Sequence, residues 1–101
     1  MNTKDVIMVR VYLHEAKAHL LDMIKYLHDE AKVRGVTVFR GVSGFGDSGR
    51  LHTATLMDMS LDLPVVVEFY DDPENAIKII DELSHRVKPR HIVYWPAKVN
   101  F

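Results

Sequence analysis

The sequence predicts an α+β protein in which a four-stranded antiparallel sheet carries two helices on one face. Three observations lead to this fold. Four runs are rich in β-branched and apolar residues, two longer segments show helical spacing, and their order is strand, helix, strand, strand, helix, strand. Two split β-α-β units in this order form a ferredoxin-like βαββαβ sandwich, here as one domain over residues 1–101.

The first half of the chain supplies a strand, a helix and a second strand. In residues 6–13, one face carries Ile7, Val9, Val11 and Leu13, and the other carries Val6, Met8, Arg10 and Tyr12. From about Ala16 to Arg34 the apolar residues recur at helical spacing, at Leu20, Met23, Ile24, Leu27 and Ala31. Gly35 is the expected end of this helix, and residues 36–42 form the second strand.

The second half supplies a strand, a helix and a last strand. Residues 63–70 form a strand, with Pro64 at its start, where proline is tolerated. Asp72 caps a helix that begins at Pro73, and its expected buried stripe is Ala76, Ile77, Ile80, Leu83 and Val87. The pair Lys88-Pro89 ends this helix. Residues 90–95 form the last strand, and Pro96 is expected to turn the remaining residues into an edge or a tail.

One face of the predicted sheet has no helix over it. That face carries Met8, Tyr12 and part of the run Val65-Val66-Val67. An exposed apolar sheet face on a small domain is typical of assembly, so we expect a homo-oligomer with its sheets facing inward. The alternative is a face of scattered apolar residues that stays open to water.

A glycine-rich segment, residues 41–52, comes after the second strand with the sequence Gly-Val-Ser-Gly-Phe-Gly-Asp-Ser-Gly-Arg-Leu-His. Such a loop can direct several backbone N–H groups at an anion, and Arg50 can add a bidentate charge. The alternative is a simple hairpin connection. The whole connection, residues 43–62, is far longer than a hairpin loop, which favours a functional segment with an ordered base and a mobile middle.

Composition excludes several classes of function. The 13 basic and 14 acidic residues give a net charge of −1, so no nucleic-acid partner is indicated. The absence of cysteine removes disulfides, thiolate catalysis and Cys-based zinc sites. No apolar run approaches the roughly 18 residues needed to cross a bilayer, so we expect a cytoplasmic protein without direct membrane insertion.

These segments also resemble a known family. Gly35-Val36-Thr37-Val38, Gly44-Phe45-Gly46, Gly49 and His52 are similar to the PII signalling proteins. A bacterial PII-like family, catalogued as domain of unknown function 190, is more similar still. Its hallmarks resemble Phe39-Arg40-Gly41-Val42, Ser48-Gly49-Arg50 and the segment Ser60-Leu61-Asp62-Leu63-Pro64-Val65-Val66-Val67. The resemblance extends over essentially the whole chain.

The resemblance implies a homotrimer that binds an adenine nucleotide (ATP, ADP or AMP), or another small anion, in clefts between subunits. It also implies that loop 43–62 contacts a target, such as a membrane transporter or an enzyme. Gly44, Phe45 and Gly46 then lie along the nucleotide, and Thr37 lies near the adenine. Asp47 and Ser48 stand where PII proteins have arginine and glutamine.

The second phosphate-binding loop of PII proteins has no counterpart by sequence. Residues 84–90 occupy its place and contain no glycine. Arg86, Lys88 and Arg90 supply the charge there, or else they are solvated surface residues.

The candidate ligand-binding residues are Thr37, Arg40, Gly44, Phe45, Gly46, Asp47, Ser48, Gly49, Arg50 and His52. Arg40 has an intersubunit salt bridge as its alternative role, and Phe45 either stacks on a base or closes the wall of the cleft. His52 either hydrogen-bonds a phosphate or supports the loop.

Two alternative functions remain open at this point. The six histidines are dispersed and lack joint ligand spacing, but trimeric CutA-like metal-tolerance proteins share the expected architecture. A small hydrolase is the other alternative, because the fold is also that of acylphosphatases. Ser43, Ser48 and Ser60 lack a recognisable base nearby in sequence, so we expect a binding protein and not an enzyme, with no metal site and no cofactor beyond the nucleotide ligand.

Overall fold

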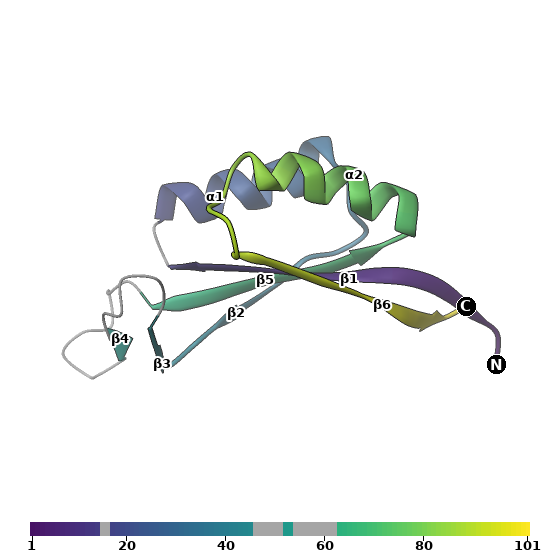
Figure 1. Ribbon diagram of the computed structural model, residues 1–101, viewed down its shortest axis with the longest axis horizontal. Coiled ribbons are helices and arrows are strands. Elements are labelled where there is room, and N and C mark those ends of the chain that lie inside the picture. The colour runs from purple at the N-terminus through teal and green to yellow at the C-terminus, as the bar shows by residue number, and fades with distance from the viewer. Residues whose placement is uncertain (15–16, 46–51, 54–62) are drawn as a thin grey trace.

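The computed structural model describes residues 1–14, 17–45, 52–53 and 63–101. Its elements are β1 (Thr3–His14), α1 (Lys17–Lys25) with a π-helical turn η1 (Tyr26–Glu30), β2 (Thr37–Arg40), β3 (Ser43–Gly44), β4 (His52–Thr53), β5 (Pro64–Asp71), α2 (Pro73–Ser84) and β6 (Ile92–Asn100). The main sheet has the order β2-β5-β1-β6, with every neighbouring pair antiparallel. Both helices lie on one face of it (Figure 1). The predicted ferredoxin-like α+β fold is confirmed.

The core lies between the sheet and the helices. Alternate residues of β1 and β5 point toward it, and the side chains that meet there are Val9, Val11, Leu13, Val65, Val67 and Phe69 from the strands and Met23, Leu27, Ile79 and Leu83 from the helices. All of them are at most 8% exposed. The apolar side chains that recur with period 2 in the strands and with period 3.6 in the helices therefore pack together in one layer, as predicted.

The first helix ends earlier than the sequence predicts. The expected helix reaches Arg34 and ends at Gly35, whereas the α-helical and π-helical turns end at Glu30. The N–H of Ala31 donates to the carbonyl of Tyr26 at 2.9 Å, and Lys32 comes next with φ = 53°. A left-handed residue ends a helix, and here Lys32 takes the role that the sequence suggested for Gly35.

The second helix begins as predicted, with Asp72 at the N-cap position and Pro73 first in the helix, although the Asp72 side chain makes no capping hydrogen bond. The buried stripe differs from expectation. The buried residues are Ala76, Ile79 and Leu83, while Ile77 is 49% exposed and was wrongly placed in the stripe. A stripe at 76, 79, 80 and 83 keeps one face of the helix toward the sheet.

The last strand is shifted and longer than predicted. It begins at Ile92, not Arg90, and continues through Pro96 to Asn100. Pro96 lies opposite Ile7 of β1. The strand tolerates proline because β6 is an edge strand, so the missing N–H can face away from the sheet. The expectation of an edge was correct, and the expectation that the strand stops at Trp95 was wrong.

The uncovered face of the sheet is largely apolar. Its large exposed hydrophobic side chains are Tyr12, Phe39, Tyr70, Val93 and Trp95, which share that face through the strand register. Near its middle, Nε of Arg10 is 3.0 Å from the Glu68 carboxylate, and the Arg10 guanidinium is 5.7 Å from the centre of the Trp95 ring. A side-chain hydrogen bond with Tyr12 and the charge of Glu68 raise the pKa of Arg10, which therefore stays cationic.

None of the helices in the described ranges has the length and apolar character needed to cross a bilayer.

Candidate functional site

Four strand ends meet at one end of the sheet. Because β1 and β2 both run antiparallel to β5, and β6 runs antiparallel to β1, the last residues of β1 and β2 lie beside the first residues of β5 and β6. His14 is opposite Pro64, and Arg40 is opposite Val65. Figure 1 shows the β3–β4 pair and the α2–β6 connection at this same end. The topology thus gathers segments that are far apart in the sequence.

A cavity of about 590 Å³ occupies this end of the molecule. Its lining comes from the end of β1 (Tyr12, Leu13, His14), from β2 and the residues after it (Phe39, Arg40, Gly41, Ser43, Phe45), from the start of β5 (Pro64, Val65, Val66) and from the α2–β6 connection (Lys88, Arg90, His91). We call it the loop-base cavity. Its size is in the range of small-molecule sites, and it combines apolar and aromatic side chains with several polar groups.

The base of the glycine-rich segment fits closely against Pro64. The N–H of Gly41 donates to the Pro64 carbonyl at 2.7 Å, and a Cβ on Gly41 would stand 2.8 Å from Cγ of the Pro64 ring. Further along, Ser43 and Gly44 pair with Thr53 and His52. The long segment is therefore held together at its base beside the cavity, as the prediction of an ordered base requires.

The charged side chains in the described lining of the loop-base cavity are all basic. Arg40, Lys88 and Arg90 line it, and among the described residues that line it none is acidic. Water screens such charges on an open surface, but apolar cavity walls reduce the screening, so the attraction between these charges and an anion becomes stronger. The cavity is therefore suited to a ligand with negative charge at one end and an aromatic or apolar part at the other.

The α2–β6 connection contains a tight turn at residues 88–91. The N–H of His91 donates to the Lys88 carbonyl at 3.3 Å, Pro89 takes the second position, and Arg90 takes the third with φ = 72°. Proline followed by a left-handed residue is the pattern of a type II turn. The carbonyl of His91 accepts from the N–H of Tyr12 at 2.8 Å, so the turn is attached to β1.

Arg86 belongs to another part of the molecule. It pairs with Glu82 at 3.2 Å, and its guanidinium lies 4.2 Å from the centre of the Tyr26 ring. Its carbonyl also lies 3.0 Å from Nε2 of His19. Arg86 thus ties α2 to the first helix, and of the three basic residues considered for the missing phosphate loop only Lys88 and Arg90 reach the cavity.

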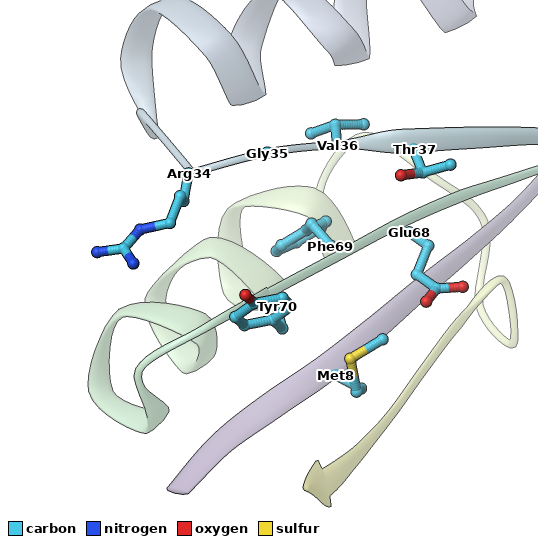
Figure 2. Close-up of a pocket in the computed structure, with 8 residues that line it drawn as sticks. All are labelled: Met8, Arg34, Gly35, Val36, Thr37, Glu68, Phe69 and Tyr70. Atoms are coloured by element: carbon cyan, nitrogen blue, oxygen red, sulfur yellow. The ribbon is translucent and has the colours of Figure 1, made fainter. Parts of the chain in front are cut away.

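The predicted ligand-binding residues fall into four groups. Arg40 and Phe45 line the loop-base cavity, and Gly44 and His52 pair at the loop base. Thr37, at the other end of β2, lines a second hollow of about 300 Å³ between β2 and β5, with Met8, Arg34, Glu68 and Tyr70 (Figure 2). Gly46, Asp47, Ser48, Gly49 and Arg50 lie outside the described residues.

Some cavity residues were not among the candidates from sequence. Tyr12, His14 and His91 line the cavity beside the glycine-rich segment. They stand at the end of one strand and before the start of another, a position that reveals a shared site only once the strand order is known.

The histidines were the basis of the metal hypothesis. Within the ranges that the structure describes, no group of three histidine or carboxylate side chains is arranged to hold a metal ion.

Comparison with known proteins identifies the family. The family model DUF190, described as "Uncharacterized ACR", matches residues 6–99. The chain belongs to this family. A UPF0166 protein from Aquifex aeolicus (strain VF5) is 32% identical over 96 residues, which cover 95% of this chain and 97% of that protein.

Solved structures share the fold of this DUF190 protein. CPII from Thiomonas intermedia K12, bound to ADP and bicarbonate, has a TM-score of 0.69 at 19% identity, covering 97% of this chain and 89% of that chain. A GlnK–ATP complex from B. subtilis has a TM-score of 0.50 at 8% identity, covering 94% of this chain and 82% of that chain. The fold is thus that of PII and PII-like proteins.

Proposed function

We propose that this chain is a PII-like signalling protein that binds an adenine nucleotide or another small anion in the loop-base cavity. The observation that carries the proposal is the cavity itself, where Arg40, Lys88 and Arg90 meet aromatic side chains at the base of the glycine-rich segment. The ADP and bicarbonate bound by CPII, which shares the fold, support this class of ligand.

The chemistry of the lining suits a nucleotide. The cationic side chains match phosphate oxygens, and guanidinium groups can hold phosphate or bicarbonate with two parallel hydrogen bonds. Phe45, which is 73% exposed, offers a ring on which a base can stack. In this proposal the backbone at Gly44, Gly46 and Gly49 approaches the ligand, with Arg50 as a further charge, and Asp47, Ser48 and His52 complete the site at this cavity. Thr37 lines the separate hollow at the other end of β2 and is not part of it.

Assembly is the second part of the proposal. Three copies pack with their apolar sheet faces inward, so that Tyr12, Phe39, Tyr70, Val93 and Trp95 are covered. Tyr12 and Phe39 belong both to this face and to the loop-base cavity. A neighbouring copy over the face therefore lies next to the cavity and can contribute to its wall, which makes it an intersubunit cleft.

Signalling is the third part. The protein acts by binding and not by turnover, in the cytoplasm, and the segment 43–62 carries the state of the cavity to a target such as a transporter or an enzyme. The base of the segment is fixed beside the cavity through the Gly41–Pro64 contact and the β3–β4 pairing, so a ligand there can bias the conformation of the segment.

Isothermal titration of the purified protein with ADP, ATP, AMP and bicarbonate tests the proposed ligand. We expect binding of at least one nucleotide, and Arg50→Ala should weaken it at least tenfold. Lys78→Ala removes one charge from the exposed face of α2 and is the matched control. If no nucleotide or bicarbonate binds at millimolar concentration, while zinc or copper raises the melting temperature, the metal-binding alternative replaces this proposal.

A further inference from the structure

A further cavity lies at the end of the sheet opposite the loop-base cavity. There the start of β1 pairs with the end of β6 and lies beside the end of β5, and Figure 1 shows both ends of the chain here, away from the β3–β4 pair. The cavity measures about 470 Å³, and its walls also include the connection between η1 and β2 and the first turn of α2. We call it the distal cavity. Its volume is within the range of small-molecule sites.

The described lining of the distal cavity carries charges of both signs, and the acidic side chains are engaged within the fold. Asp72 pairs with Nζ of Lys4 at 2.9 Å, and the Asp71 carboxylate accepts the N–H of Asp72 at 2.7 Å. Lys32 and Arg34 also line the cavity, and in the described part of the chain neither makes an ion pair, a hydrogen bond or a ring contact. Two cationic side chains are therefore available to an anion.

Lys32 is held at the cavity in a costly backbone conformation. Its φ is 53°, a left-handed value that glycine adopts without strain and that costs other residues about 1–2 kcal/mol. The N–H of Ala31 donates to the Tyr26 carbonyl at 2.9 Å. The N–H of Val33 donates to the Leu27 carbonyl at 3.1 Å, so the chain is fixed on both sides of Lys32. Since strained residues cluster at functional sites, the strain indicates a role for the ammonium group beyond the fold.

Arg34 stands two residues further along the same connection. It lines the distal cavity and also the smaller hollow beside Thr37, and in Figure 2 its side chain extends away from Thr37. A guanidinium can hold a carboxylate or a phosphate with two parallel hydrogen bonds, and the Lys32 ammonium adds a second charge from the same connection. These two side chains give the cavity an anion-binding edge.

The rest of the lining suits a hydroxylated molecule. The Asn75 amide can both donate and accept, and the Asp71 and Asp72 carboxylates have more acceptor positions than their internal contacts use. Nζ of Lys4 lies 5.6 Å from the centre of the Phe101 ring, yet Phe101 is 82% exposed, so its ring can still pack against the apolar face of a sugar. Hydroxyl groups and one anionic group thus find partners in the same cavity.

We propose that the distal cavity is a second ligand site, which binds a small polyhydroxylated anion of the sugar phosphate or sugar acid class. Arg34 and Lys32 hold the anionic group, and the hydroxyl groups bind Asn75 and the two carboxylates. The site lies at the opposite end of β1 and β5 from the loop-base cavity, so the proposal does not depend on nucleotide binding.

Amide NMR spectra of the wild-type protein locate the site. The probes are glucose 6-phosphate, gluconate and glucose, which combine a similar hydroxylated body with a phosphate, a carboxylate or no charge. At millimolar concentration, with or without ADP, at least one charged probe should shift the signals of Lys32, Arg34 and Asn75, and glucose should shift them far less. The charged probe that binds more tightly identifies the anionic group. No shift with either charged probe, equal shifts with glucose, or largest shifts at Gly41 and His91 would overturn the proposal.

Charge substitutions test the two cations. Arg34→Gln and Lys32→Gln should each weaken binding of the charged probe about tenfold, through loss of a charge-assisted hydrogen bond. Lys25→Gln is the matched control, because Lys25 is exposed on α1 and lines neither cavity, and its effect should stay below about twofold. Wild-type affinity in Arg34→Gln or Lys32→Gln, or an equal loss in Lys25→Gln, would overturn the assigned contacts.

Urea unfolding separates the charge of Lys32 from its backbone strain. Lys32→Gly should bind the charged probe as weakly as Lys32→Gln and unfold at the same or a higher urea concentration than the wild type, because glycine is unstrained there. A lower unfolding midpoint would assign Lys32 a structural role and overturn its role in binding. Failure of the wild-type protein to bind any nucleotide would instead overturn the proposed function and leave this inference intact.

Discussion

The contact between Gly41 and Pro64 predicts a graded response to glycine substitution. An alanine Cβ at position 41 would lie 2.8 Å from Cγ of Pro64 and 3.3 Å from its carbonyl oxygen. Two carbon atoms prefer about 3.5–4.0 Å, so the two segments must separate by roughly 0.7 Å or more. The proline ring cannot rotate away, because it is part of the backbone and Pro64 is held opposite His14 in the sheet.

The magnitude is set by this geometry. Overpacking of this kind costs about 1–3 kcal/mol, and here it also lengthens the 2.7 Å hydrogen bond from Gly41 to Pro64. Gly35→Ala is the matched control, since a Cβ there meets nothing within 4 Å. Alanine lowers the conformational entropy of the unfolded chain, so the free energy of unfolding of that variant should stay unchanged or rise by about 0.4–1 kcal/mol. Gly44→Ala, with its nearest atom at 3.2 Å, should fall between the two.

Urea unfolding followed by circular dichroism measures the order of the three variants. For a domain of this size each kcal/mol lowers the melting temperature by about 4–8 °C, so thermal unfolding gives an independent measure. Because Gly41 and Pro64 both line the loop-base cavity, Gly41→Ala should also weaken ADP binding. Equal unfolding midpoints for Gly41→Ala and Gly35→Ala would refute the reasoning, because only position 41 has an atom in the way of the added Cβ.

Three further predictions concern the core, the open sheet face and the helix pair. Leu83→Ala removes a fully buried side chain and should destabilise the fold by about 2–5 kcal/mol in urea unfolding; a loss below about 1 kcal/mol would contradict the assigned core. Glu68→Gln leaves the Arg10 guanidinium without its ion-pair partner on the face that assembly covers. Sedimentation should therefore show the assembly dissociating at a protein concentration at least tenfold higher than for the wild type. The double variant Arg10→Met with Glu68→Met should restore assembly. Burial raises the pKa of Tyr26 above its usual 10, so its stabilising contribution is complete below about pH 10 and is lost as the pH rises through the raised pKa. The difference in absorbance at 295 nm between the wild type and Tyr26→Phe should titrate above pH 10, and titration at or below pH 10 would contradict a raised pKa for this partly buried phenol.

Much of the fold can be predicted from local patterns in the sequence. The alternation in β1 and the apolar stripe of the first helix predicted which of their side chains enter the core. The wrong predictions concern features that depend on contacts with other residues of the folded chain. Gly35 has the local character of a helix end, but the chain leaves the helix at Lys32, where hydrogen bonds to Tyr26 and Leu27 close the last turn. Ile77 and Ile79 are equally apolar, and only the position of the sheet decides that Ile79 is buried.

The candidate site divides in the same way. The sequence predicted the glycine-rich segment, Arg40 and Phe45 as site residues. Several glycines, an arginine and an aromatic residue stand close together there, directly after a strand. The sequence left Lys88 and Arg90 open between a ligand-binding role and a solvated surface. Tyr12 was predicted only as part of the open sheet face, and nothing in the sequence assigned Tyr12, His14 or His91 to the ligand site. Their common position at one cavity results from strand order and direction, which no local window of sequence contains.

The amino-acid sequence by itself determined the order of elements, the two amphipathic helices and the apolar character of both sheet faces, since these depend on residue type at periods of 2 and 3.6. Only the tertiary structure decided that the C-terminal ends of β1 and β2 meet the turn at residues 88–91, and that Arg90 stands there in a left-handed conformation. The physical reason is that antiparallel pairing joins segments that are distant along the chain, and backbone strain in one of them becomes visible only when the others hold it in place.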